Sequence, residues 1–496
     1  MIRYILLIAL FIAIPWHLKA QQLDDNRIFA PSDMQKDFNY LRERLENTHP
    51  GLYMHETKEV MQYKMDSLYS LLKVPLSFYQ FYGIITQLIA DVKCEHTSCS
   101  PYKNDEFQSR IQQYKLLPFN LYFSQHKAYV LVNMTKDTSI HLGDEVCFIN
   151  HQPVDSLERI LLKYIPSDGD METSKERLLS GGMAFNVWYY LFINHPESFD
   201  IKFKSLDGTI KERKLGNISS FKESNRNALN NLANKRIIAI SKKGKRDAAN
   251  PWRLELLKER KAAILTIRTF SGDKKAMFEK FEKFFNRIKT DKIANLIIDL
   301  GDNGGGDEAA AAELFSYLIL KPTYFITDEY LITDKDSYLK QADLPADMLD
   351  NKMKYIKKEQ NGKFFVQQET QAELKPCDPR SDRYTGKIYL YVNGGTCSAA
   401  STFAALVQSN HLGTIVGQET GGSYFGGGSS VGLNLTLPNS GIIAHTSIVY
   451  CDFAVSGNHD KNRGVIPAYY FVPAFSELVH GNTSWKDYIF ELIEKN

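Results

Sequence analysis

The chain has 496 residues, of which 43% are hydrophobic and 24% charged, a composition typical of a globular protein with several domains. Its formal net charge of +2 gives no electrostatic basis for a nucleic-acid partner. Six cysteines are too few for a disulfide scaffold, and neither CxxC nor HExxH occurs, so we expect no metal and no cofactor.

Residues 1–20 have the pattern of an export signal. Arg3 precedes an apolar run from Tyr4 to Trp16, and Ala20 offers a small-residue cleavage site. The apolar run is short for a membrane span, and no later segment reaches the length that a span needs. We therefore predict a signal peptide and an exported mature chain, periplasmic or secreted, without a membrane span.

Residues 21–105 are predicted to form a helical N-terminal segment. Apolar residues recur at three- and four-residue spacing in 34–53 and again in 77–92. The loop "KCEHTSCSPY" (93–102) follows the second of these stretches. Cys94 and Cys99 are close enough in sequence to pair in an oxidising compartment, and the sequence leaves open whether they do.

Residues 106–215 are predicted to form a separate domain. Two strand-like runs around a turn precede "GDEVCFINHQPV" (143–154), and an amphipathic helix and a strand pair with a "DG" turn follow. The order and the motif resemble a PDZ domain. Residues 216–250 are polar and rich in Asn and Lys, and we expect them to be a linker.

Residues 251–496 alternate between strand and helix patterns. The apolar strand patterns are followed by a glycine-rich turn, an amphipathic helix or a small-residue helix, and a polar insertion interrupts them at about 321–384. This order predicts right-handed βαβ crossovers and a largely parallel sheet. The predicted strands cover 262–270, 293–300, 387–393 and 413–417.

A glycine-rich turn, Gly304 to Gly306, lies between a buried strand and a helix. Exposed backbone N–H groups and the start of the following helix make such a turn suitable for binding an anion. Asp307 and Glu308 stand where a Walker motif has Lys and Ser or Thr, so phosphate is disfavoured. The acidic residues do not have the spacing of a calcium loop. A tight turn that simply needs glycine is the alternative.

Ser398 joins a strand to a small-residue helix, a position that suits either an N-cap or a nucleophile. As a nucleophile it would have the amide of Ala399 as an oxyanion donor, with a second donor from the glycine-rich turn. Ser430 fits G-x-S-x-G but lacks the flanking strand and helix. Ser271 is better explained as a helix cap, and Cys397 would need the exposed position of its neighbour.

Two stretches resemble the tail-specific (C-terminal processing) serine peptidase family: "NLIIDLGDNGGG" (295–306) and "YLYVNGGTCSAASTFAALVQSNHLGTIVGQETGG" (389–422). The match extends over about 250–475, and a preceding PDZ-like module is common in that family. The resemblance implies an α/β peptidase core of the ClpP/crotonase type with Ser398 as nucleophile. It implies oxyanion donors at the amides of Ala399 and Gly305, with Gly304 as the alternate.

The resemblance also bears on the general base. One branch of the family uses a lysine some two dozen residues after the serine, but no lysine lies between Ser398 and Lys461. The tricorn-core-like branch uses a histidine in a D/C-G-H-T motif, and "CEHT" (94–97) matches this motif with Glu95 in place of glycine. The resemblance therefore implies His96 as the base, which suits a neutral imidazole at pH 7.

The sequence offers two candidates for the acid that would orient this base. Tricorn-like members carry an acid just before G-V-x-P, where this chain has Lys461. The adjacent Asp460 is the expected acid, and Glu419 is the alternative. The chain also departs from the family pattern at Gly301, Ser401 and Ala468.

The sequence thus predicts an exported serine endopeptidase that cleaves peptide or protein substrates through an acyl-enzyme on Ser398. The predicted order is signal peptide, helical segment, PDZ-like domain, linker and peptidase core. The alternative is a catalytically silent ligand- or peptide-binding protein on the same fold, and a third possibility is an interaction scaffold that uses its PDZ-like domain. The oligomeric state stays open.

Overall fold

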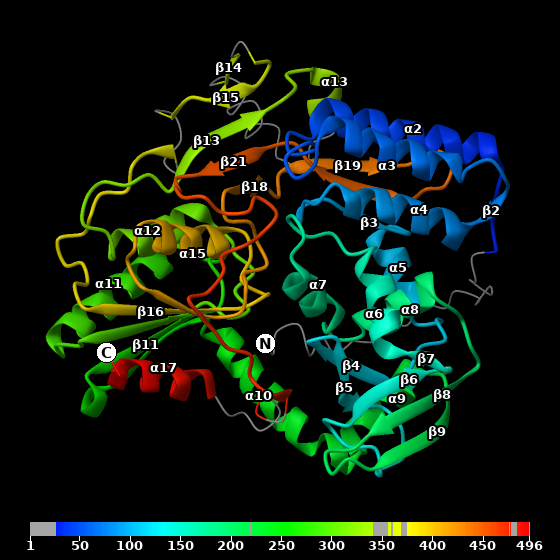
Figure 1. The fold of residues 1–496 in the computed structure, drawn as a ribbon, viewed down its shortest axis with the longest axis horizontal. Coiled ribbons are helices and arrows are strands. Elements are labelled where there is room, and N and C mark those ends of the chain that lie inside the picture. Colours follow the sequence, from blue (N-terminus) through cyan, green and yellow to red (C-terminus); the bar gives the residue numbers. More distant parts are fainter. Residues whose placement is uncertain are drawn as a thin grey trace.

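The structure is a computed structural model that describes residues 26–218, 220–340, 356–358, 361–368, 374–475, 477 and 484–495. The expected signal peptide, 1–20, lies outside these residues. Within the described ranges, no helix is both long and apolar enough to cross a bilayer. The described chain arranges into a C-terminal α/β core, an N-terminal group of helices beside it, and a mainly antiparallel domain next to both (Figure 1).

The core is built on a six-stranded sheet, and its α/β pattern confirms the fold class predicted from the sequence. The first strand pairs antiparallel with its neighbour and all other pairs are parallel. Its central strands are apolar on both faces because helices cover both sides. In spatial order the strands are β10 (Trp252–Leu257), β11 (Ala262–Ile267), β12 (Asn295–Asp299), β16 (Lys387–Val392), β17 (Thr414–Gly417) and β22 (Tyr469–Tyr470).

Helices lie on both faces of this sheet (Figure 1). On one face α11 (Lys274–Thr290), α12 (Glu308–Ser316) and α15 (Ala399–Ser409) pack over Leu296 and Ile298. On the other face α17 (Ser484–Lys495) packs over Ile297 through Trp485. Alternate residues of β12 thus enter two different apolar clusters, as the two-residue period of a strand requires.

A second, five-stranded sheet stands beside α12 and α15. It contains β14 (Ile356–Lys358), β15 (Phe364–Val366), β13 (Ile326–Leu331), β21 (Tyr450–Phe453) and β18 (Gly426–Gly428) in spatial order. The insertion expected at 321–384 therefore contributes three strands to the core. It pairs with the segment that follows β17 through the antiparallel β13–β21 contact.

The helical N-terminal segment consists of α2 (Pro31–Thr48), α3 (Lys58–Ser70) and α4 (Phe78–Asp91). It is joined to the core by β3 (Ser98–Ser100), which pairs with β20 (Ile443–Ser447), itself paired with β19 (Gly432–Thr436). The buried Asp37 of α2 also accepts hydrogen bonds from the amides of Asn439 and Ser440. The loop between α4 and β3 is thereby held against the core. Cys94 and Cys99 in this region are free thiols.

Within residues 106–215, most of the buried apolar side chains gather in a cluster separate from the main core. The strands lie where the sequence predicted them, and the helices cover one face of the sheet. The likeness to a PDZ domain stays a prediction. The strands are β4 (Phe119–Ser124), β5 (Lys127–Asn133), β6 (Glu145–Ile149), β7 (Gln152–Pro153), β8 (Ser198–Lys204) and β9 (Ile210–Gly216), and the helices are α6 (Val154–Leu162), α7 (Glu172–Leu179) and α8 (Ala184–Phe192), preceded by α5 (Asn104–Ile111).

The expected linker, 216–250, is mostly helical: it contains α9 (Phe221–Asn230), η1 (Leu232–Asn234) and α10 (Lys235–Ala249). The Ser220 side chain caps α9 by accepting the amide of Glu223. The buried Asn234 exchanges hydrogen bonds with the backbone of Asn133. The segment expected to be a linker therefore has regular secondary structure. Its polar residues have structural roles, because its Asn and Ser side chains cap helices and form hydrogen bonds to the neighbouring domain.

Candidate active site

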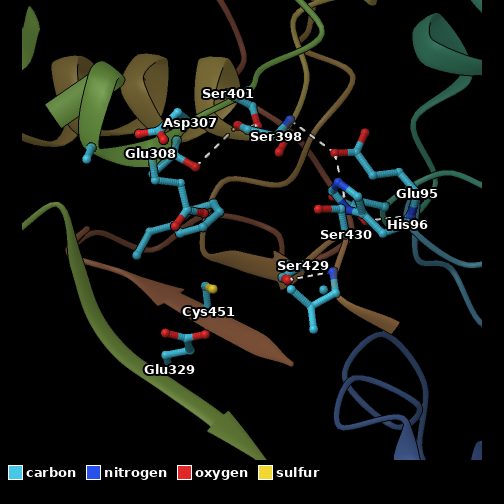
Figure 2. Close-up of a pocket in the computed structure, with 18 of the residues that line it drawn as sticks. Glu95, His96, Asp307, Glu308, Glu329, Ser398, Ser401, Ser429, Ser430 and Cys451 are labelled. Atoms are coloured by element: carbon cyan, nitrogen blue, oxygen red, sulfur yellow. Dashed lines mark hydrogen bonds and ion pairs between the residues drawn. The ribbon is translucent and has the colours of Figure 1, made fainter. Parts of the chain in front are cut away.

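The glycine-rich turn and the Ser398 turn both follow parallel strands, at the carboxyl ends of β12 and β16. This edge of a parallel sheet is where ligands usually bind in α/β proteins. A cavity of about 240 Å³ lies there, and its walls include Ser398, His96 and Asp168. Figure 2 shows Ser398 at the end of its helix, with Glu95 and His96 on the adjoining wall. The structure thus brings the predicted nucleophile and the predicted base to one cavity.

Ser398 has a strained backbone, with φ 50° and ψ −132°. A residue other than glycine pays about 1–3 kcal/mol to occupy such a conformation, which is found mainly at functional turns. Its side chain makes no capping hydrogen bond to α15. The N-cap explanation of this serine is therefore not observed, and its hydroxyl is available at the cavity.

Two backbone amides near Ser398 can donate to an oxyanion. Ala399 is the first residue of α15, where an amide has no partner within the helix. Gly306 lines the cavity, and its amide has no hydrogen-bond partner among the described residues. The amide of Gly305, the donor expected from the sequence, is instead bonded to Asn303 Oδ1 at 2.9 Å. Gly304 is not among the residues that line the cavity.

Gly305 has a different role, because it allows the two turns to approach each other. Its φ is 91°, and a Cβ added there would lie 2.7 Å from the Cβ of Ser398 and 2.8 Å from the carbonyl oxygen of Cys397. Both the backbone conformation and the space therefore exclude a larger residue.

Replacing Gly305 with Ala is expected to lower kcat by about 100-fold or more, because the new methyl group must displace Ser398, the predicted nucleophile. It is also expected to lower the free energy of unfolding by about 1–3 kcal/mol through backbone strain. Peptide hydrolysis and thermal unfolding measure the two effects. Gly216→Ala is the matched control, since a Cβ at Gly216 meets nothing within 4 Å. Full activity in Gly305→Ala would contradict the close approach.

His96 lies in the loop between α4 and β3, and its side chain is 20% exposed. Burial lowers the pKa of this imidazole, while the negative charge of Asp168 and the backbone of Gly428 oppose the shift. Its Nδ1 atom is buried and has no hydrogen-bond partner in the described part of the chain. An imidazole that is neutral at pH 7 and faces the cavity has the properties of a general base.

Asp168 is a carboxylate at this site that the sequence analysis did not identify. It lies between α6 and α7, is 4% exposed, and its Oδ1 accepts the amide of Glu95 at 2.8 Å. Burial and the nearby Glu95 raise the pKa of Asp168 to about 7, and the charge of His96 opposes this rise. The turn "SDGD" (167–170) is the only local signal for it, and this turn lies in the region assigned to the PDZ-like domain.

The two acids proposed from the sequence lie elsewhere. Asp460 is exposed, and its Oδ1 accepts the amide of Asn462 at 2.9 Å. Glu419 is buried and forms an ion pair with Arg463 at 2.7 Å. Neither residue lines the cavity, and the neighbouring Lys461 is exposed. The structure therefore does not bring Asp460 to His96.

The two alternative nucleophiles near the cavity are Cys397 and Ser430. Burial, followed by the charge of Glu95, raises the pKa of the Cys397 thiol well above its usual value, so this thiol is not a ready nucleophile. Ser430 lines the cavity but lies in the connection between β18 and β19, without a helix behind it. Of these three candidates, Ser398 is the one that lines the cavity at the start of a helix.

The described residues include one group of possible metal ligands, His126, Glu158 and Glu176, whose donor atoms lie within 4.8 Å of one another. His126 Nδ1 is 3.2 Å from Glu158 Oε2, and its backbone amide donates to Glu176 at 3.1 Å. Ion pairs and hydrogen bonds among the three residues therefore explain why their side chains lie close together. The group shares no residue with the cavity.

Residues 261–470 match the model of the family described as peptidase family S41. None of the curated proteins matches the chain. The fold is similar to the crystal structure of mature CPAF, with a TM-score of 0.61 and 16% identity over 94% of this chain and 97% of that chain. It is also similar to mature CPAF complexed with lactacystin, with a TM-score of 0.59 and 16% identity over 94% and 98% of the two chains.

A third solved structure, the photosystem II D1 C-terminal processing protease, matches with a TM-score of 0.40 and 12% identity over 88% of this chain and 93% of that chain. At 16% identity the likeness to mature CPAF shows the fold alone. The family match is more specific, because it spans the strands from β11 to β22 together with both turns at the cavity. The core, residues 261–470, therefore matches peptidase family S41, and this match supports a serine-type peptidase.

Proposed function

We propose that the chain is an exported serine endopeptidase in which Ser398 is the nucleophile, His96 the general base and Asp168 the acid that supports the base. The observation that carries the proposal is the strained Ser398 turn at the start of α15, in the cavity that also contains His96. The signal pattern of residues 1–20 supports export.

In the acylation step, the Ser398 hydroxyl oxygen bonds to the carbonyl carbon of the scissile peptide while His96 takes the hydroxyl proton. The carbonyl oxygen becomes an oxyanion, to which the amides of Ala399, at the start of α15, and Gly306, on the cavity wall, would donate. The C–N bond then breaks, and the imidazolium returns the proton to the leaving amine. An acyl-enzyme on Ser398 remains.

In the second step, water attacks the ester carbonyl while His96 accepts a proton from it. The bond between the Ser398 oxygen and the acyl carbon then breaks, the imidazolium returns the proton to that oxygen, and the carboxylic acid product is released. Asp168 provides negative charge beside the imidazolium that forms in each step, which lowers the energy of both transition states. No metal is required for this sequence of proton transfers.

A lysine base is a poorer explanation of the same cavity. Lys274 lines the cavity, but its ammonium forms an ion pair with Asp307 at 2.8 Å and its side chain is 52% exposed. A catalytic lysine needs a strongly lowered pKa, which requires burial away from negative charge. Lys274 is neither buried nor away from negative charge.

A fluorophosphonate probe that reacts with activated serines tests the proposal. We expect one covalent adduct, located on Ser398 by peptide mass spectrometry and absent from Ser398→Ala, because an activated hydroxyl beside oxyanion donors attacks phosphorus as it attacks a carbonyl. A catalytically silent binding protein on the same fold would give no adduct. An adduct on Ser430 or Cys397 would assign the chemistry to a different residue.

A further inference from the structure

The side chain of Glu95 contacts the backbone of the nucleophile. Its Oε1 accepts the amide hydrogen of Ser398 at 3.0 Å, and its side chain is 12% exposed. Glu95 lies in the loop between α4 and β3, far from Ser398 in the sequence. Figure 2 shows it between His96 and Ser398, with marked contacts to both.

This contact acts where the backbone is under strain. Ser398 holds φ 50° although it is not glycine, so its peptide unit must be fixed by the surroundings. A carboxylate that accepts an N–H forms a stronger hydrogen bond than a neutral acceptor does. It also satisfies an amide at the start of α15 that the helix itself leaves without a partner.

Glu95 also contacts the other two residues of the site. It directly precedes His96, and its Oε1 is 3.8 Å from His96 Nδ1. Its backbone amide donates to Asp168 Oδ1 at 2.8 Å. The backbone of Glu95 thus binds the acid while its side chain binds the turn of the nucleophile.

We propose that Glu95 is a positioning residue, whose carboxylate holds the strained Ser398 turn so that the hydroxyl faces the cavity beside His96. The inference rests on the proposed function, because it concerns the geometry of that same nucleophile. Glu95 lines the cavity, and in this role its carboxylate acts through the Ser398 turn and not on the scissile bond.

The charges around Glu95 make this role dependent on pH. The titratable groups that face it are Asp168, His96, Cys94 and Cys397. Burial raises the pKa of Glu95 to about 7, while the Cys397 thiol and the Ser398 amide favour the ionised form. The group is therefore about half ionised near pH 7 and fully ionised only well above it, and its bond to the Ser398 amide weakens as the pH falls through this range.

Glu95→Ala and Glu95→Gln test the inference. We expect Glu95→Ala to lower kcat and the rate of fluorophosphonate labelling by about 10- to 100-fold, with KM changed less than about threefold, because the turn relaxes while the substrate cleft remains. Gln retains an oxygen that can accept the Ser398 amide, so Glu95→Gln should stay within about fivefold of the wild type.

The pH profile gives a readout that a purely structural role would not move. Glu95 raises the pKa of Asp168, so its removal in either variant should shift the acid limb of kcat to lower pH, by about 0.5 to 1 unit. Asp37→Asn is the matched control, since Asp37 is also a buried carboxylate that accepts backbone amides, but it lies in α2. It should lower the melting temperature and leave the pH profile unchanged.

The inference requires that kcat decrease in the order wild type, Glu95→Gln, Glu95→Ala. The kcat of Glu95→Ala must be at least about tenfold below that of the wild type, and Glu95→Gln must recover most of that loss; any other order overturns the inference. Equal loss in both variants would show that the carboxylate is needed for another reason. If the wild-type enzyme neither hydrolyses peptides nor reacts with the probe, the proposed function fails instead. If it labels on Ser398 but the variants do not follow this order, only the role of Glu95 fails.

Discussion

Ser398→Ala and His96→Ala are each expected to lower kcat by about three to six orders of magnitude, and the double variant hardly more. The reason is that the two side chains act as one unit, since the hydroxyl attacks only as its proton leaves to the imidazole. Both residues line the same cavity, and burial keeps the imidazole neutral at pH 7. Initial rates with an unstructured protein substrate measure the loss.

The matched control is Lys461→Ala, which changes an exposed side chain outside the cavity and should leave kcat within about twofold. KM should change little in the two active-site variants, because neither side chain is needed to bind the peptide in its ground state. An enzyme that keeps its activity as His96→Ala and loses it as Lys461→Ala would show that the base has been assigned to the wrong residue.

Asp168→Asn is expected to lower kcat by about two to four orders of magnitude, whereas Asp460→Asn should stay within about threefold of the wild type. Asp168 is buried beside His96 and opposes the lowering of its pKa, so its charge stabilises the imidazolium of the transition state. Asp460 is exposed and bonds only to its own turn. Asparagine keeps the shape of Asp168 and removes the charge, which makes the comparison specific.

The pH profile of the same variant gives a second test. Burial raises the pKa of Asp168 to about 7, so the wild-type enzyme should be active above this pH and lose kcat as the pH falls and the carboxylate takes up a proton. Asp168→Asn has no such proton to take up, and the part of the acid limb due to Asp168 should disappear. Loss of activity in Asp460→Asn, with Asp168→Asn unaffected, would return the role to the residue predicted from the sequence.

The parts of the fold that could be predicted are those set by local pattern. The run "NLIIDL" (295–300) is apolar at consecutive positions, which is the pattern of a strand buried on both faces, and it is the centre of the parallel sheet. The helices of segment 216–250 could not be predicted in this way, because they are stabilised by contacts, such as the hydrogen bond between Asn234 and Asn133, that no local pattern reveals. The polar composition of this segment indicates that its side chains face solvent, but it does not predict the secondary structure of the backbone.

In the candidate site, too, some residues could be predicted from local sequence pattern and others could not. Ser398 could be found because a strand, a turn and a small-residue helix surround it in sequence, and His96 because "CEHT" stood in a family pattern. Asp168 could not be found in this way, since its place beside His96 depends on how the α6–α7 connection packs on the core. Local pattern could not distinguish the neighbouring amides of the glycine-rich turn: the Asn303 side chain accepts the Gly305 amide, so we propose Gly306 as the oxyanion donor in its place.

The shared sheet of β3 and β20 has a consequence for when the enzyme can first act. The proposed base and acid lie early in the chain, whereas the nucleophile lies near its end and β20 follows it. During synthesis, a chain that has emerged only as far as residue 390 contains His96 and Asp168 but no nucleophile. Because β20 and β3 must pair before the base is held in place, hydrolytic activity should begin only after almost the whole chain has been made and has folded. The peptidase would therefore be inert towards other proteins during most of its own synthesis.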